Sequence, residues 1–375
     1  MFLASCGRFA EAIAACAPDA FAERVPVQLR VRASIIDSQR GELDTAILKI
    51  REILDEDPDN AFAWSQLAEW WQQKGEHAKA LSAAKRLIEI APRAPASWGY
   101  VAECLANQGK LDECKTHLQR SIELDPSYLY GGYALLSLQT DAAEYDDALR
   151  TLSIVGPHLT DHERCAREAR LQALANRQDE SLAALRRATH AIAESAALLI
   201  DAADAMLRNG WAEPLKSQLS EEIKAGRASP AAVFVLIDVL TREAKLSAIE
   251  ELCNSLDPAS PHWAEGVSAY VEALGEAKAE DRIDTFVKPR ADLLRRQSRT
   301  WGLVGGAYEQ CGWLHETVAW MSDWPNRDDT QPHQFVSLAL AQLQLGELEQ
   351  VRAIVEHALA LPVAAATDPL RVLGA

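Results

Sequence analysis

Long apolar runs are missing from this sequence. The two most apolar stretches, PAAVFVLIDVL and LALPVAAA, are interrupted by Asp238 and Pro362, whereas a membrane-spanning helix needs about 20 consecutive apolar residues. A secretion signal is missing as well, because only five residues precede Cys6 in the opening MFLASCGR and the apolar part of a signal peptide takes about 7 to 15. We therefore expect a cytoplasmic protein with no membrane insertion.

Basic charge is scarce too. Lys and Arg together number 38 against 55 Asp and Glu, which gives a formal net charge of −17. A surface of this sign repels nucleic-acid phosphates and anionic lipids. The composition predicts no nucleic-acid partner, and it accommodates a basic protein segment more easily.

Signatures of catalysis and of bound cofactors are also absent. The sequence has no phosphate-binding loop, no GxGxxG, no GxSxG and no HExxH, and its seven cysteines form no CxxC pair. The spacing of His158, His162 and Cys165 is metal-like, but nothing nearby completes the set of about three or four converging ligands that a site needs. We predict no catalytic residue, no metal and no cofactor, and we expect the cysteines to be reduced.

What the sequence does contain is an internal repeat. Prolines recur at 58, 92 and 126, glycines at 41, 75 and 109, and tryptophans at 64 and 98, all at intervals of 34 residues. Three independent markers with one period predict a repeat architecture.

One repeat, residues 61–94, has the pattern of a helical hairpin. Trp64, Leu67, Ala68 and Trp71 have the i, i+3, i+4, i+7 spacing of a helix face. A glycine at 75 permits a tight turn, and a second apolar face then runs to a proline at 92. Neither helix can bury its apolar face alone, so neighbouring hairpins must stack.

This pattern resembles the tetratricopeptide repeat family. The first matching set is Trp64, Leu67, Ala68, Trp71, Gly75, Ala80 and Pro92, and the next is Trp98, Val101, Ala102, Leu105, Gly109 and Pro126. The resemblance implies an all-α, right-handed α-solenoid of about ten and a half repeats.

The same register predicts the domain organisation. We expect a continuous solenoid over residues 1–365, with a partial repeat at 1–26 and a C-terminal tail at 366–375. The repeats are predicted to start near 27, 61, 95, 129, 162, 196, 230, 264, 298 and 332. Residues 1–26 contain only a second helix, so we favour a fragment of a longer protein or an alternative start.

Two repeats depart from the pattern, and we expect irregular geometry in both. The repeat at 162–195 has Glu168 at a normally apolar position and Asn176 in place of the turn glycine. The repeat at 264–297 has Pro289 inside its second helix, where the missing N–H and the ring should kink or end that helix.

The resemblance also implies a binding surface. In this family the first helices line the concave face, and the second, fifth, ninth, twelfth and thirteenth positions of each repeat look into it. The ninth position is acidic in five of the ten repeats, and a row of like charges attracts cations. The alternative is an ordinary solvated acidic face.

The predicted groove contains tyrosines between two acidic rows, and Arg208 and Arg242 at the thirteenth position are alternative partners for the nearby acids. Tyr100 is one position off the groove set. The predicted partner-binding residues are Phe62, Ser65, Glu69, Gln72, Gln73, Tyr100, Glu103, Tyr130, Tyr133, Asp204, Asp238 and Glu272.

Three other groups of residues have a structural and a functional interpretation. Cys104 and Cys114 are either small buried side chains or a redox pair, and the former fits better. The tryptophans at 313, 320 and 324 are favoured as a seal of the last repeats over an interaction patch. In WSQLAEWWQQKG, residues 64–75, we predict that the tryptophans build the wall and that the polar residues between them face a ligand.

We therefore expect a non-catalytic scaffold or adaptor that docks a basic protein segment in an acidic groove. Two alternatives stay open: the repeat region of a larger or multi-chain enzyme or regulator, and an assembly partner that uses its convex side. Binding of an acidic chaperone C-terminus is disfavoured, because the Lys and Asn that the family uses for it are replaced by Ser65 with Glu69, or Gly99 with Glu103.

Overall fold

The computed structural model describes residues 5–16, 25–191, 196–327 and 330–361. Within these ranges the regular elements are α-helices and short 3-10 helices, and they form an all-α repeat solenoid. The predicted tail, residues 366–375, lies outside the described residues. The chain packs as two compact units, Met1–Thr160 and Asp161–Ala375, and the continuation of one array through both units stays a prediction.

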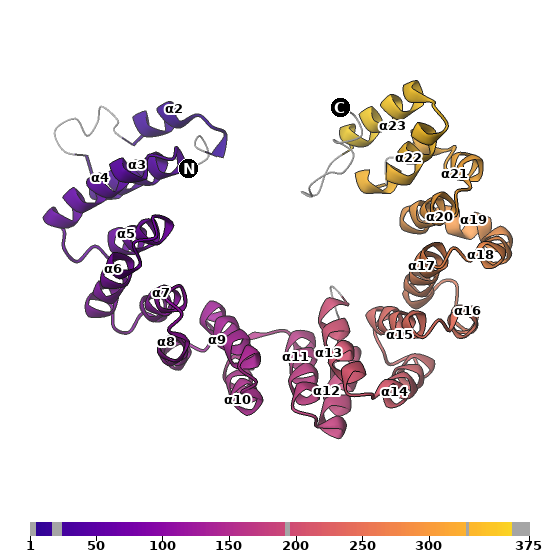
Figure 1. Cartoon of the computed structure of the whole chain (residues 1–375), viewed down its shortest axis with the longest axis horizontal. Helices are drawn as coiled ribbons and strands as arrows, with labels where there is room; N and C mark the ends of the chain where they lie inside the picture. Colours follow the sequence, from indigo (N-terminus) through magenta and orange to yellow (C-terminus); the bar gives the residue numbers. More distant parts are fainter. Residues whose placement is uncertain (1–4, 17–24, 192–195, 328–329, 362–375) are drawn as a thin grey trace. The chain divides into compact units, whose positions relative to one another are not determined.

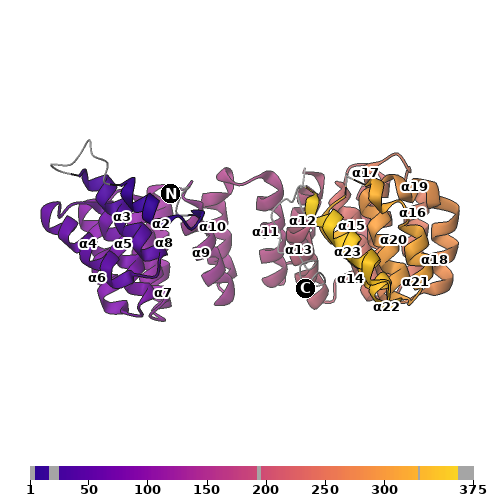
Figure 2. The same ribbon diagram turned by 90° about the horizontal axis from the view of Figure 1, so that it is seen from above.

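The first unit is a stack of helical hairpins. Within it, α5, α7 and α9 lie on the inner side of the stack and α6, α8 and α10 on the outer side (Figure 1), and the helices run side by side (Figure 2). The elements are α2 (Phe9–Ala14), α3 (Val27–Gln39), α4 (Leu43–Glu56), α5 (Ala61–Gln73), α6 (His77–Ile90), α7 (Pro95–Ala106), α8 (Leu111–Leu124), α9 (Leu129–Asp141), α10 (Tyr145–Val155) and η2 (Gly156–His158).

The hairpin of α5 and α6 illustrates how local sequence sets these elements. The side chain of Asn60 accepts a hydrogen bond from the backbone N–H of Ala63 at 3.0 Å and so caps the start of α5. Trp70 is only 1% exposed and fills the interior of the stack, while Leu87 of α6 is 3% exposed. The backbone of Gly75 has φ +73°, which ends the first helix and turns the chain into the second.

The second unit is built on the same plan. Within it, α13, α15, α17 and α20 lie on the inner side (Figure 1), and α17 packs directly against both α15 and α20. Its elements are α11 (Asp161–Leu174), α12 (Gln178–His190), α13 (Ala197–Arg208), α14 (Ala212–Lys224), α15 (Pro230–Arg242), α16 (Leu246–Ser255), α17 (Pro261–Glu276), α18 (Glu280–Val287), η3 (Lys288–Arg290), α19 (Ala291–Arg296), α20 (Ser298–Gln310), α21 (Leu314–Trp320), η4 (Trp324–Asn326), η5 (Pro332–Phe335), α22 (Val336–Gln344) and α23 (Leu348–Ala360).

Of the two repeats that were expected to be irregular, only the one at 264–297 is. The prediction for Pro289 is confirmed, because α18 ends at Val287, a 3-10 turn follows, and α19 starts a new helix at Ala291. The expected irregularity around Glu168 and Asn176 is not seen, because α11 and α12 are both regular helices. Glu168 is partly exposed and pairs with Arg187 at 2.9 Å, and asparagine tolerates the left-handed conformation that the turn requires.

The C-terminal tryptophans pack inward, as the sealing interpretation predicts. Trp320 is 6% exposed and donates a hydrogen bond from Nε1 to the carbonyl of Trp301 at 2.8 Å. Trp301 is fully buried and donates to Asp323 at 3.0 Å. Trp313 and Trp324 are half-buried, and Trp324 packs against His357 of α23, so these rings fill the interior of the last described hairpins.

In the described part of the chain, a left-handed residue turns each hairpin, from α3–α4 to α22–α23, from its first helix to its second. The positions are Gly41, Gly75, Gly109, Ala143, Asn176, Gly210, Ala244, Lys278, Gly312 and Gly346, all with φ between +48° and +86°. Four of these residues have a Cβ, and each therefore carries a conformational penalty of roughly 1 to 2 kcal/mol in this region.

Replacing Ala244 with glycine is expected to stabilise the second unit by about 0.5–1 kcal/mol, because Ala244 is exposed and has φ +55°. The midpoint of urea unfolding, followed by circular dichroism, should rise at unchanged slope. The matched control is Ala183→Gly at an exposed position inside α12, which should destabilise by about 0.5–1 kcal/mol. Equal losses in both variants would contradict the assignment of strain to this turn.

Candidate protein-binding surfaces

Acidic and tyrosine side chains gather on the first helices of the first unit. We call Glu69, Tyr100, Glu103, Tyr128 and Tyr130 the tyrosine–glutamate cluster. They come from α5, α7 and the start of α9. Tyr130 and Glu103 are close enough for each to shift the pKa of the other, and the rings of Tyr128 and Tyr130 lie 5.9 Å apart. The cluster joins three successive hairpins.

The charges in this cluster disturb one another. Partial burial and the nearby carboxylate of Glu69 raise the pKa of Glu103, while the phenol of Tyr130 opposes the shift. Burial and the charge of Glu103 raise the pKa of Tyr130 to about 12. Two carboxylates that repel each other beside neutral phenols form a surface on which a cation would be stabilised.

Tyr128 belongs to this cluster and was missed by the sequence analysis. It precedes α9 and is half-buried. Its hydroxyl lies over Gly99, where a Cβ would approach it to 2.6 Å. The glycine at a predicted groove position was the available signal, because a missing side chain leaves room for a neighbour.

The other predicted residues of the first unit differ in their exposure. Phe62 is 55% exposed on α5, and Gln73 donates to Glu69 at 3.3 Å. Gln72 instead bridges two repeats, since it donates to Sγ of Cys104 at 3.0 Å and accepts from Asn107 at 2.7 Å. Tyr133 is half-buried.

Ser65 is 5% exposed and donates to the carbonyl of Phe62 at 2.8 Å. Its side chain therefore satisfies its own helix and is not displayed to a ligand. Cys104 and Cys114 are also buried, and burial raises the pKa of both thiols, which lowers their reactivity.

In the second unit, an internal cation neutralises part of the predicted acidic row. Arg242 contacts Asp204 of α13 at 2.6 Å and Asp238 of α15 at 2.8 Å. The guanidinium occupies the position that a partner cation was expected to take. This agrees with the alternative that Arg242 pairs with the nearby acids of its own chain. Glu272 of α17 lies beyond this bridge, and burial together with the carboxylate of Glu276 raises its pKa.

A cavity of about 180 Å³ lies between α15 and α17 beside this bridge. Its apolar wall includes Phe234, Ile237 and Ala273, and its acidic residues are Asp238, Glu272 and Glu276. Two of the predicted groove residues, Asp238 and Glu272, therefore line one cavity.

A larger cavity of about 590 Å³ lies beside α8 in the first unit. Its charged side chains are paired with one another: Lys115 contacts Glu144 at 2.7 Å and Asp112 at 3.2 Å, and Arg120 contacts Glu123 at 3.1 Å. With its charges paired, this cavity exerts no strong attraction on a ligand of either sign.

The metal-like spacing in the sequence forms no site in the structure. His162 is buried and its Nδ1 contacts the carbonyl of Ala188 at 3.2 Å. Over the described residues, no group of three His, Cys, Asp or Glu side chains is arranged to hold a metal ion. Among the same residues no helix is both long enough and apolar enough to cross a membrane.

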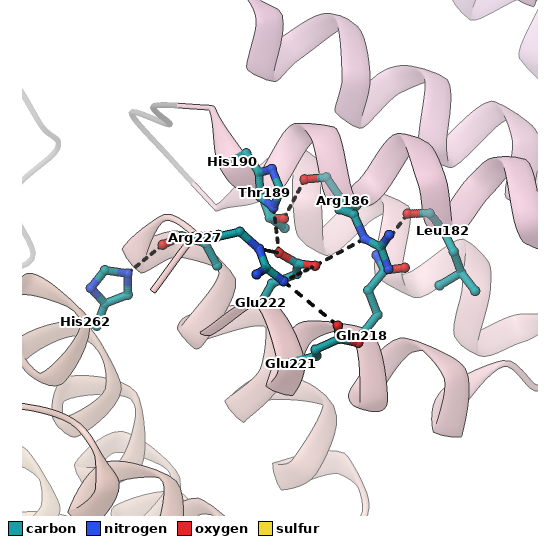
Figure 3. Close-up of polar contacts among 10 residues, drawn as sticks. Leu182, Arg186, Thr189, His190, Gln218, Glu221, Glu222, Arg227 and His262 are labelled. Carbon is teal, nitrogen blue, oxygen red and sulfur yellow. Dashed lines mark hydrogen bonds and ion pairs between the residues drawn. The ribbon is translucent and has the colours of Figure 1, made fainter. Parts of the chain in front are cut away.

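A buried carboxylate in the second unit is surrounded by two arginines and a histidine (Figure 3). Glu222 of α14 is 2% exposed and contacts Arg186 at 3.2 Å, His190 at 2.7 Å and Arg227 at 2.7 Å. These hydrogen bonds, that of Arg227 foremost, lower the pKa of Glu222 to about 2. The cluster ties α12 to α14 and to the turn after α14, so its role is structural.

Residues 97–128, which cover most of α7 and all of α8, match the family model of the tetratricopeptide repeat. These residues are similar to a tetratricopeptide repeat, and the hairpins stacked around them share its plan of helix, turn and helix. Stacked repeats of this kind present extended concave surfaces that serve as scaffolds for protein interaction.

Several solved structures resemble this chain. TTC0263, a thermophilic TPR protein in Thermus thermophilus, is 21% identical, covers 48% of this chain and 100% of its own, and has a TM-score of 0.33. The C-terminal part of a TPR repeat-containing protein from Cytophaga hutchinsonii is 14% identical, covers 71% of this chain and 96% of its own, and has a TM-score of 0.45. The structure of Naa15/Naa10 bound to HypK-THB is 13% identical, covers 92% of this chain and 64% of its own, and has a TM-score of 0.41. Comparison with curated proteins gives no match.

Stability of the second unit should depend on pH through Glu222. Its folded pKa, about 2, lies below the ordinary value of 4.5, so its contribution is complete above 4.5 and is lost as the pH falls toward 2. Glu222→Gln should lower the free energy of unfolding by about 2 kcal/mol at pH 7 and by progressively less as the pH falls from 4.5 to 2. Urea titrations at several pH values measure this, with the exposed Glu251→Gln as control. A variant whose loss is the same at every pH would overturn the assignment.

Proposed function

We propose that this protein is a non-catalytic scaffold that docks a basic protein segment on the inner faces of its first helices. The observation that carries the proposal is the tyrosine–glutamate cluster, in which partial burial and the carboxylate of Glu69 raise the pKa of Glu103. A bound Lys or Arg would relieve that repulsion, so binding energy is available at this surface.

The tyrosines of the cluster suit the same ligand. Tyr130 is 51% exposed, its ring lies 5.9 Å from that of Tyr128, and the charge of Glu103 is near enough to raise its pKa. An aromatic ring beside a carboxylate can pack on the methylenes of a Lys or Arg side chain or lie against its cation. Phe62, 55% exposed on α5, extends the apolar part of the surface along the stack.

The second unit offers the acidic residues Asp238 and Glu272 in the same role. Here the charge that a partner meets is reduced by Arg242, which already pairs with Asp204 and Asp238. The proposal therefore assigns the first unit the larger share of the electrostatic attraction.

Charge reversal tests the proposal. Glu69→Lys combined with Glu103→Lys is expected to remove the partners that the wild-type chain captures from extracts of its native cell, or to weaken their affinity at least about tenfold, because like charges would then meet. Glu52→Lys with Glu113→Lys is the matched control, since both residues are exposed on the second helices α4 and α8. Capture is measured by mass spectrometry, and helical content and melting temperature are measured for each variant.

Retained capture by the Glu69 and Glu103 variant, with its melting temperature unchanged, would reject the proposal. Equal losses in the two double variants would also reject it, since the effect would then follow net charge alone. If the captured partner carries a catalytic domain, the scaffold serves to recruit a partner for that catalytic part.

Ionic strength provides an independent prediction. Exposed charges are screened beyond about 10 Å at 0.1 M salt. The dissociation constant for a captured partner, measured by titration calorimetry, should rise clearly between about 50 and 200 mM NaCl, mainly through a slower association rate. An affinity that does not change with salt would indicate an apolar docking mode instead.

A further inference from the structure

The cavity between α15 and α17 combines an apolar wall with carboxylates. Ile237 is 1% exposed and Ala273 is 4% exposed, so two neighbouring helices supply a rigid apolar wall. The half-buried Phe234 and Thr241 of α15 complete that side. An apolar recess of about 180 Å³ fits the end of one side chain.

The carboxylates of this cavity come from both helices. Glu272 and Glu276 are one helical turn apart on α17, so they face the same direction. Within the described residues neither has a cation within 4 Å, whereas Asp238 across the cavity is paired with Arg242. Glu272 and Glu276 repel each other, and their mutual charge contributes to the raised pKa of Glu272.

We propose that this cavity receives one lysine or arginine side chain of the docked segment. The methylenes of such a side chain would pack against Phe234, Ile237 and Ala273, and its cation would lie between Glu272 and Glu276. Long basic side chains pair an apolar stem with a charged end in this way. The inference rests on the proposed function, because it assigns a specific pocket to the basic segment.

Charge complementarity selects this occupant over others. An acidic side chain would meet three carboxylates, and a purely apolar side chain would leave Glu272 and Glu276 with their repulsion and would cover them without a hydrogen-bond partner. A basic side chain can pack its methylenes on the apolar wall and pair its cation with the carboxylates.

Methyl NMR on the full chain tests the assignment directly, with the methyl groups of Ile237, Ala269 and Ala273 as reporters inside the cavity. The probe is the peptide acetyl-Gly-Gly-Lys-Gly-Gly-amide, with its arginine, norleucine and Nε-acetyl-lysine counterparts. The lysine and arginine peptides should shift these methyl signals saturably. The two neutral peptides should bind at least about tenfold more weakly, because they lack the cation.

Two variants separate charge from shape. Glu272→Gln with Glu276→Gln should weaken the lysine peptide at least about tenfold, whereas Glu251→Gln with Asp292→Asn, exposed on the outer helices α16 and α19, should leave its affinity unchanged. Thr241→Phe should fill the recess and abolish the methyl shifts while every carboxylate remains. Circular dichroism melts confirm that each variant is folded.

Equal affinity for the lysine and norleucine peptides would overturn the inference. So would lysine binding that persists unchanged in the Thr241→Phe variant, or methyl signals that never shift. None of these results touches the tyrosine–glutamate cluster. If they occur while Glu69→Lys with Glu103→Lys still abolishes partner capture, the pocket assignment fails and the proposed function stands.

Discussion

Every hairpin of this protein depends on burying an apolar face that it cannot bury by itself. In the first unit, Trp70 is buried because α5 lies between neighbouring helices. In the second unit, α17 and α20 can pack closely because residue 275 is glycine: a Cβ there would come within 2.9 Å of the Ala307 backbone. The stacking uses the apolar faces, and it leaves the polar faces of the inner helices available. The candidate binding surfaces therefore consist of the polar faces that stacking does not bury.

Much of the fold could be predicted because a repeat makes local spacing carry long-range information. The 34-residue period locates each turn, and the left-handed residue recurs even at Ala143, Asn176, Ala244 and Lys278, where glycine is absent. Stacking against neighbours imposes the turn there, so tertiary packing overrides local preference. The break at Pro289 could be predicted for a different reason, because the missing N–H acts within a single helix.

The candidate site could be predicted only in part. Position within a repeat gives the direction of a side chain relative to its own helix, but its partners depend on how far it reaches across neighbouring repeats. Arg242 reaches Asp204, 38 residues earlier, and Gln72 reaches Cys104, 32 residues later. The Ser65 hydroxyl donates a hydrogen bond to a carbonyl of its own helix, as short hydroxyl side chains often do. Tyr128 lies outside the helix positions that the repeat pattern considers.

Arg242 changes the thermodynamic meaning of the acidic surface in the second unit. Since its guanidinium already lies between Asp204 and Asp238, a cation that comes to those carboxylates exchanges with a resident one, and the number of ion pairs stays the same. Such an exchange is nearly neutral in energy, and it selects ligands by geometry rather than by charge. It also allows the chain to hold many acidic residues along one face without strong nonspecific attraction for every basic protein in its surroundings.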